Sequence, residues 1–316
     1  MRELVLTRTN PMIDPRVHIW GWEISLYLFL GGMVAGMMII SGYFLFKGRH
    51  KEMACSCLTL PPVAILLLSI GMLALFFDLE HRWYFWRMYT TFQPTSPMSW
   101  GSWILLLVYP ALLANALLGV PAPVERRLPF LVRLLKAIHQ HPGVISAIGV
   151  ANITLGIALG MYTGILLSAF GARPLWNSAI LGLLFLTSGL SSAAAFVHMV
   201  SRDKVESVLL AKADNGFLAF ELVLILLFLI GLVSSTRVHM EAAMLVLTGP
   251  YAPAFWVFVI GLGIVVPLFL QSLALRHRIA HTPIAPILVV AGGLALRFVI
   301  VAAGQSSHWT RLIFTN

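Results

Sequence analysis

The chain has 316 residues, of which 59% are hydrophobic and only 10% are charged, and its mean hydropathy is +0.91. Soluble globular chains are about 45–50% apolar, so this composition excludes an ordinary soluble domain and indicates a membrane protein. The net charge of +9 does not indicate nucleic-acid binding, because the sequence has no basic, aromatic-interleaved soluble domain to carry it.

The first 20 residues are polar, carry three arginines and lack the apolar core of a cleaved signal peptide. We therefore expect the first apolar run to direct its own insertion. Continuous runs of roughly 18 or more apolar residues follow, each long enough to cross a hydrocarbon layer about 30 Å thick. Because these runs do not alternate with polar residues, they predict an all-α polytopic membrane protein and exclude a barrel.

Eight spans are predicted, and together they form a single integral membrane domain over residues 1–316. The expected ranges are roughly 22–46, 59–77, 100–119, 144–170, 177–200, 216–235, 253–275 and 284–304. Small residues crowd the first span at 31–36 (GGMVAG) and the fifth at 188–195 (SGLSSAAA). Such residues let helix backbones approach closely in a membrane, so we interpret both runs as packing surfaces.

The positive residues predict the orientation. The loops near 47–58, 120–143, 201–215 and 276–283 hold 12 of the 21 Lys and Arg residues, whereas the two termini and the other loops hold 8. The positive-inside rule places the richer loops in the cytoplasm. It therefore places both termini outside, in a multi-pass protein of a bacterial inner (cytoplasmic) membrane.

The second and third spans are joined by an unusual connection, FFDLEHRWYFWRMYTTFQPTSPMSWGSW at 76–103. It contains four tryptophans and two tyrosines, together with five ionisable residues: Asp78, Glu80, His81, Arg82 and Arg87. The aromatic residues are compatible with an ordinary interfacial belt. They are equally compatible with the wall of a binding pocket at the outer face.

Ionisable and polar residues within spans are costly and are candidates for function. Those expected in the outer half are Glu23, Tyr27, Asp78, Tyr162 and Arg297, and those expected in the inner half are Asn152, His198 and Glu221. Each has a structural alternative. The acidic residues can lie at the headgroup level, and Arg297 can form an ion pair with one of them.

The motifs of several cofactors and enzymes are missing. A membrane haem needs two facing axial histidines, but only His198 is expected inside a span. Two cysteines, Cys55 and Cys57, are too few to ligate an iron–sulfur cluster, which takes four thiolates. The sequence also lacks HExxH and any His/Cys cluster with metal-ligand spacing. We therefore expect no haem, cluster or metal site in this chain.

The 76–103 segment resembles the signature segment of the NrfD/PsrC family, the quinone-interacting membrane subunits of polysulfide reductase and related respiratory complexes. Three further segments agree in order and spacing: WGWEISLYLFLGGMVAG, GMYTGILLSAFGARPLWNSAILGLLFLTSGLSSA and GGLALRFVIVAAGQ. The family pattern DLGRP is replaced by DLEHR at 78–82. The family's first-helix histidine and asparagine are replaced by Tyr27 and Ile24, while its fourth-helix tyrosine is matched by Tyr162.

The resemblance implies eight helices in two four-helix bundles and a quinone (menaquinone or ubiquinone) bound near the periplasmic face. It also implies a ferredoxin-like iron–sulfur partner subunit, which connects to a periplasmic catalytic or multihaem cytochrome subunit. Two other classes stay open: a membrane anchor without quinone chemistry, and a secondary transporter. Pro267 and the Gly-Gly pair of the eighth span could be breaks of the kind found in transporters, but no internal repeat accompanies them.

For a quinone site, the expected roles follow from side-chain chemistry. Asp78, Glu23 and His81 are expected to exchange protons, and Arg297 to stabilise negative charge on the bound ring. The remaining expected contacts to the ring are Tyr162, Tyr27, Thr163 and Trp100. A proton path from the inner face is expected to use Glu221, His198 and Asn152.

Overall fold

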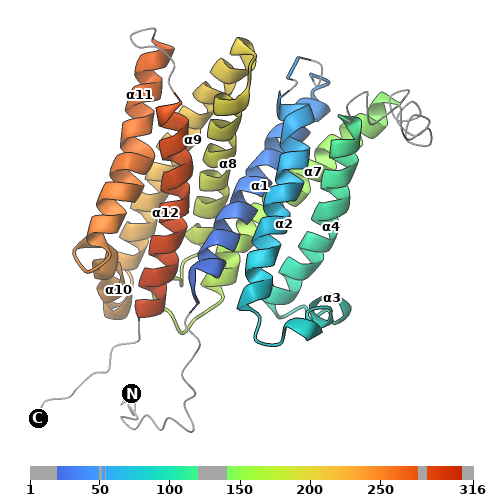
Figure 1. Ribbon diagram of the computed structural model, residues 1–316. Helices are drawn as coiled ribbons and strands as arrows, with labels where there is room; N and C mark the ends of the chain where they lie inside the picture. The colour runs from blue at the N-terminus through green and yellow to red at the C-terminus, as the bar shows by residue number, and fades with distance from the viewer. Residues whose placement is uncertain (1–19, 50–51, 54, 120–140, 277–282, 308–316) are drawn as a thin grey trace, which may run out of the picture.

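The computed structural model describes residues 20–49, 52–53, 55–119, 141–276 and 283–307. These residues form helices and no strand, which confirms the all-α prediction. Eight of the helices are long and apolar enough to cross a membrane, as predicted. Figure 1 shows them standing side by side. The loop near 120–143, which holds the most Lys and Arg residues of the predicted cytoplasmic loops, lies mainly outside the described residues.

The eight spans follow one another without an intervening domain. In chain order they are α1 (Trp22–Phe46), η1 and α2 (Cys55–Thr59 and Leu60–Asp78), α4 (Pro97–Leu118), α7 (Pro142–Ser168), α8 (Ile180–Val200), α9 (Lys204–Val233), η3 and α11 (Ala254–Val265 and Val266–Leu275) and α12 (Ile284–Ser306). The shorter helices are η2 (Arg82–Tyr84), α3 (Arg87–Thr90) and α10 (Arg237–Leu247).

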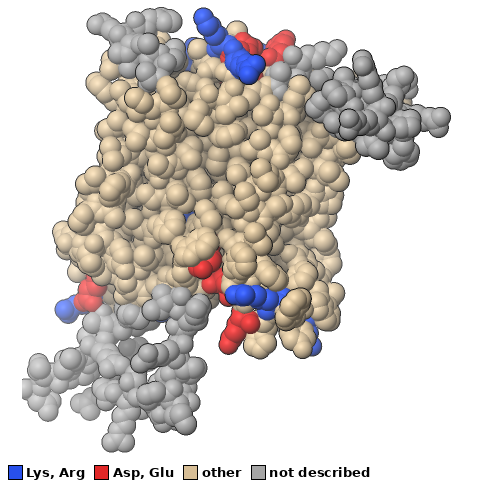
Figure 2. Space-filling model, viewed as in Figure 1, with Lys and Arg blue, Asp and Glu red and all other residues tan. Residues whose placement is uncertain are grey.

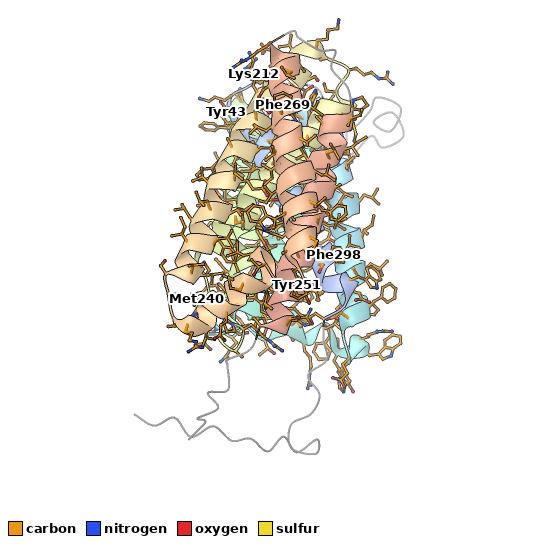
Figure 3. The ribbon with its side chains drawn as sticks, turned by 90° about the vertical axis from the view of Figure 1, so that its left-hand side faces the viewer. Tyr43, Lys212, Met240, Tyr251, Phe269 and Phe298 are labelled. Atoms are coloured by element: carbon orange, nitrogen blue, oxygen red, sulfur yellow. The ribbon has the colours of Figure 1, made fainter. Side chains whose placement is uncertain are left out.

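The two ends of the molecule can be named by the groups that lie there. Figure 1 places α3 and α10 at one end, where α1 begins and α12 finishes, and we call this the α3 end. Figure 3 places Lys212 near the opposite end from Met240 and Tyr251, and we call that end the Lys212 end. The first and last described segments meet at the α3 end, where the Gln305 amide donates to the Trp20 carbonyl at 3.0 Å.

The two most buried helices, α1 and α8, pack through the small residues identified in the sequence. A Cβ added at Gly36 would lie 2.4 Å from the Gly189 carbonyl oxygen, and one added at Gly189 would lie 2.2 Å from the Gly32 carbonyl oxygen. A side chain cannot be accommodated at such distances. The predicted role of the two small-residue runs in close helix packing is therefore confirmed.

The sixth span differs most from its prediction. It was expected at 216–235 but begins at Lys204, capped by the Asp203 carboxylate, which accepts from the Val205 N–H at 2.9 Å. The polar stretch before residue 216 is helical because its acidic groups find partners. Glu206, for example, accepts the backbone N–H groups of Cys55 and Ser56 at 3.1 and 2.7 Å. As a result, Glu221 lies in the middle of the helix and not in its first turns.

Helix contacts do not separate cleanly into two groups. One set comprises α1, α2, α4 and α7, and another comprises α8, α9, η3, α11 and α12. However, α1 also packs on α8 and α12, and α7 packs on α8. The predicted division into two four-helix bundles and the external placement of both termini remain predictions.

Charge is concentrated at the two ends, with a largely uncharged band between them (Figure 2). In the described part of the molecule, the loops and helix termini of the α3 end carry Arg82, Arg87, Arg173 and Arg237. The Lys212 end carries Lys47, Arg49, Arg202, Lys204, Lys212 and Arg276. This distribution has the same sense as the positive-inside prediction.

Candidate functional site

A cavity of about 370 Å³ lies at the α3 end, enclosed by α1, α2, α4, α7 and the connection between α2 and α4. Its volume lies within the roughly 300–1,000 Å³ typical of small-molecule sites. Most of its wall is apolar. The polar side chains that line it are those of Tyr27, Ser69, Asp78, Tyr89, Ser102 and Tyr162.

Helical spacing brings these residues to one place. On α1 the lining residues Ile24 and Tyr27 are three apart, and on α7 Tyr162 and Leu166 are four apart. Residues three or four apart share one face of a helix. The lining residues of α2 and α4 also recur at intervals of three or four along each helix: Ser69, Met72, Phe76, Met98, Ser102 and Leu105.

The position of the Tyr162 ring depends on a glycine of α4. A Cβ added at Gly101 would lie 1.9 Å from Tyr162 Cζ and 2.0 Å from its hydroxyl oxygen. Any side chain at this position would displace the ring. Gly101 therefore allows the phenol of α7 to reach across to the wall formed by α4.

The connection between α2 and α4 closes the end of the cavity and is held by side-chain hydrogen bonds. Ser102 Oγ lies 2.8 Å from the carbonyl oxygens of Met88 and Ser99. The Trp100 indole donates to the Pro94 carbonyl at 2.7 Å. At the start of the connection, Arg82 donates to the Phe77 carbonyl at 2.9 Å, so DLEHR forms a turn in which the arginine closes back on the end of α2.

Asp78 and Tyr89 place a carboxyl and a phenol at this closed end. Asp78 is the last residue of α2 and is partly buried, and Tyr89 comes from α3. Burial raises the pKa of Tyr89 above its ordinary value, and the neighbouring Tyr109 raises it further. The Tyr89 phenol is therefore protonated at neutral pH and can donate a hydrogen bond.

The cavity extends to the surface of the molecule. Three of its lining side chains are about half exposed: Leu73 (52%), Met98 (48%) and Phe85 (47%). Leu73 is on α2 and Met98 on α4, so the opening lies on the lipid-facing flank near the α3 end. A long apolar ligand could enter there from the lipid.

Four predicted site residues do not line this cavity. Glu23 is partly buried in the first turn of α1, and His81 is exposed just before η2. Thr163 is buried but donates to the Gly160 carbonyl of its own helix at 2.7 Å. Trp100 is 45% exposed on the outside of α4. The structure thus brings Tyr27, Tyr162 and Asp78 together and leaves these four outside the cavity.

Arg297 also lies away from the cavity, fully buried between α12 and α8. Its Nη1 donates to Ser188 Oγ at 2.7 Å and its Nη2 to the Phe185 carbonyl at 2.8 Å. The guanidinium carbon lies 4.3 Å from the centroid of the Phe185 ring. Its acidic neighbour is Glu221 of α9, whereas the sequence suggested Glu23 or Asp78 as a partner.

The three residues of the predicted proton path are not brought together. Asn152 lies on α7 and donates to the Ala111 carbonyl of α4 at 3.1 Å, whereas Glu221 lies among α8, α9 and α12. His198 is partly buried near the end of α8. Sequence reasoning missed Asp214, which is fully buried two helical turns before Glu221. The seven-residue spacing of these acids was the available signal for a shared face.

Metal ligation finds no support in the described part of the protein, where no group of three or more His, Cys, Asp or Glu residues could hold an ion. Cys55 and Cys57 lie at the start of the second span as free thiols. The cavity is lined by three phenols, one carboxyl and apolar side chains, which are groups suited to an apolar organic ligand.

A family model described as "Polysulphide reductase, NrfD" matches residues 10–307. The chain belongs to the NrfD family. A polysulfide reductase component of Wolinella succinogenes is 32% identical to this chain over 306 residues. The match covers 91% of this chain and 95% of the relative. Protein NrfD of Escherichia coli is 30% identical over 308 residues, with the same coverage of both proteins.

A more distant relative is a selenate reductase component of Mesobacillus selenatarsenatis. It is 24% identical over 313 residues, which cover 89% of this protein and 73% of the relative. The matches extend through all eight spans, so the NrfD-family assignment applies to both the cavity and the buried Arg297 region.

Proposed function

We propose that this NrfD-family protein is the membrane subunit of a respiratory oxidoreductase complex and that it binds quinone or quinol in the cavity at the α3 end. The observation that carries the proposal is a lipid-accessible apolar cavity in which three phenols and one carboxyl converge. A quinone would supply two-electron, two-proton redox chemistry when bound. The protein must hold the ring, hydrogen-bond its oxygens and exchange protons.

The polar lining residues provide these functions. Tyr27 and Tyr162 are 3% and 6% exposed, so their hydroxyl groups act in a site that excludes most water. Hydrogen bonds made in such an environment are stronger than in water. Tyr27 and Tyr162 would donate to the ring oxygens, and Asp78 would accept or return a proton near the aqueous boundary.

The apolar lining residues account for the choice of a lipid-soluble ligand. Met72, Phe76 and Leu105 offer flat or flexible apolar contacts to a ring. The opening between Leu73 and Met98 would let an isoprenoid tail extend into the bilayer. A polar metabolite would gain little from these walls, since apolar surface supplies most of the contact area.

The proposed partner is a ferredoxin-like iron–sulfur subunit docked at the α3 end, connected to a periplasmic catalytic or multihaem cytochrome subunit. Two features support this end as the docking face. The connection that closes the cavity exposes Trp83 (87%) and Trp86 (50%), and tryptophan is enriched at protein interfaces. The distribution of Lys and Arg favours a periplasmic location for this end in a bacterial inner membrane.

The test is quinone binding and quinol-dependent turnover by the purified complex carrying Leu105→Trp, which fills the cavity from α4. Leu106→Trp is the matched control, because Leu106 is 47% exposed and does not line the cavity. We expect Leu105→Trp to abolish binding and Leu106→Trp to leave it unchanged. Unchanged binding in a correctly assembled Leu105→Trp complex would reject this site, whereas an unmodified complex that binds no quinone would favour a simple membrane anchor.

A further inference from the structure

A second set of buried polar groups lies among α8, α9, α11 and α12, and we call it the polar column. Its members are Ser188, Ser191, Ser192, Asp214, Glu221, Gln271 and Arg297, all less than 5% exposed. Buried polar groups are expensive inside a membrane, so their alignment through four helices needs an explanation. None of them lines the cavity described above.

The polar column has two parts, and Asp214 lies at the centre of the part nearer the Lys212 end. Its two carboxylate oxygens accept from Ser191 Oγ at 2.6 Å and from Gln271 Nε2 at 2.7 Å. The groups facing it are thus neutral ones from α8 and α11, with Glu221 two turns along its own helix. On the neighbouring turn, Asn215 donates to Ser272 Oγ at 3.5 Å. A carboxyl held by neutral partners in a buried site can take up and release a proton.

Glu221 and Arg297 form the other part, nearer the middle of the membrane. Ser188 lies beside both residues and accepts a hydrogen bond from Arg297. Arg297 Nη2 lies 3.1 Å from the position that a Cβ of Gly32 would occupy. The polar column therefore ends against α1, the helix that carries Tyr27 into the cavity.

Four atoms of this region are buried without a protein hydrogen-bond partner within the described residues: Ser192 Oγ, Asn215 Oδ1, Gln271 Oε1 and Arg297 Nε. Buried polar atoms are normally bonded, and ordered water is their usual partner when the protein provides none. Gly293 is packed closely against the same region. A Cβ at Gly293 would lie 2.7 Å from Ser192 Oγ and 3.5 Å from Ser188 Oγ.

We propose that the polar column is a proton path in which buried water links Asp214 to Glu221, with protons entering from the Lys212 end. A proton leaves water at that end and binds the Asp214 carboxylate. It passes through water beside Ser192 and Gly293 to the Glu221 carboxylate, and Arg297 balances the charge of Glu221 whenever that group is deprotonated. Glu221 then releases the proton toward the α3 end, so each acid gains and loses one proton, and no electron moves along the column.

The coupling of this path to redox chemistry rests on the proposed function, because turnover at the cavity would drive it. The experiment uses the whole complex in proteoliposomes, with proton uptake on each side and membrane potential measured per electron transferred. Asp214→Asn removes the first acid, and Gly293→Ala places a methyl group against Ser192, beside the proposed water, without changing any charge. The controls are Asp203→Asn, which keeps an exposed helix cap, and Gly231→Ala, where an added Cβ meets nothing within 4 Å.

We expect Asp214→Asn and Gly293→Ala to lose proton uptake at the Lys212 end while quinone binding in the cavity is retained. Both controls should behave as wild type. Wild-type proton uptake in both column variants, or turnover by the unmodified complex without uptake at that end, would overturn the path and leave the quinone site intact.

Infrared spectroscopy tests the column without quinol turnover. We expect a carboxylic acid band that is absent from Asp214→Asn and shifts when the unmodified complex is placed in D₂O. A band that does not exchange, or the lack of such a band, would overturn the path. An unmodified complex that binds no quinone but shows the D₂O-sensitive carboxylic acid band would reject the proposed function and retain the path.

Discussion

The cavity at the α3 end and the polar column are both lined by buried polar side chains, yet they differ in filling and in charge. The cavity is hollow and lined by phenols, apolar side chains and one carboxyl at its edge. The column is fully buried and contains two carboxyls and a guanidinium. The space for a ligand therefore lies among α1, α2, α4 and α7, whereas the buried charged groups lie among α8, α9, α11 and α12.

The difference shows that depth and residue type alone do not define a site. Arg297 and Tyr162 are both polar residues of spans near the same membrane half, but their partners differ. Tyr162 reaches a cavity because Gly101 leaves room for its ring. Arg297 is enclosed by Phe185, Ser188 and Glu221. Removing its side chain should therefore affect stability and proton transfer more directly than ligand binding.

The largest expected effect comes from Arg297→Leu. Removing the guanidinium leaves Ser188 and the Phe185 carbonyl without their buried donor and takes away the cation that neighbours Glu221. Hydrogen bonds that involve a charged group contribute about 1.5–3 kcal/mol each. We expect thermal unfolding of the complex at a clearly lower temperature. The double variant Glu221→Gln, Arg297→Leu should recover part of the loss, because neither charge then remains. Additive losses in the double variant would show that the two residues are not coupled.

Asp78→Asn should have the next largest effect, on turnover and not on stability. If Asp78 transfers protons at the cavity, its loss should lower quinol-dependent turnover by roughly 10²–10⁴-fold, the usual contribution of a general acid or base. Steady-state kinetics of the assembled complex measures this. Glu80→Gln is the control, since Glu80 is exposed and does not line the cavity. Equal activity of both variants would exclude Asp78 from the chemistry.

A smaller effect is expected from Tyr162→Phe, which removes one hydroxyl from the cavity. One hydrogen bond contributes about 0.5–1.5 kcal/mol, so quinone binding should weaken by roughly 2–10-fold. Gly101→Ala should weaken it further because it displaces the whole ring. Gly143→Ala provides the control, as an added Cβ there meets nothing within 4 Å. Binding titrations that rank the two cavity variants in the reverse order would contradict this geometry.

The smallest effect concerns pH and Tyr89, whose pKa is raised by burial. Below pH 10 the phenol is protonated in both the folded and the unfolded protein, so it adds no pH dependence. Above pH 10 the unfolded protein loses the proton first, and stability should fall as pH rises. Tyr89→Phe should make this alkaline decline shallower in a comparison of unfolding temperatures. An identical decline in the two proteins would show that Tyr89 is not buried as described.

Much of the fold could be predicted because each span is a continuous apolar run, and the first predicted range coincides with α1. The start of α9 could not be predicted from hydropathy, because Glu206 and Asp214 interrupt the apolar pattern. Their cost is offset by hydrogen bonds from residues distant in the sequence, including Ser56 and Gln271. Such partners become visible only when the helices are packed.

The candidate site was predictable in part for similar reasons. Tyr27, Asp78 and Tyr162 were placed together by depth and by family resemblance, and they line one cavity. Arg297 was placed with them by depth, but the direction in which a helical side chain points depends on its neighbours. Gly101 carried no signal of its own, because its role depends on a ring from another helix.

The most direct test of the central claim is photoaffinity labelling of the complex with an azido-quinone, mapped by mass spectrometry. A quinone site at the α3 end predicts labels on the lining stretches 20–27, 69–79, 98–105 and 162–166, competed by excess quinone. Competed labels on the segments of the polar column, 185–192, 214–221 or 293–297, with the cavity stretches unlabelled, would contradict it.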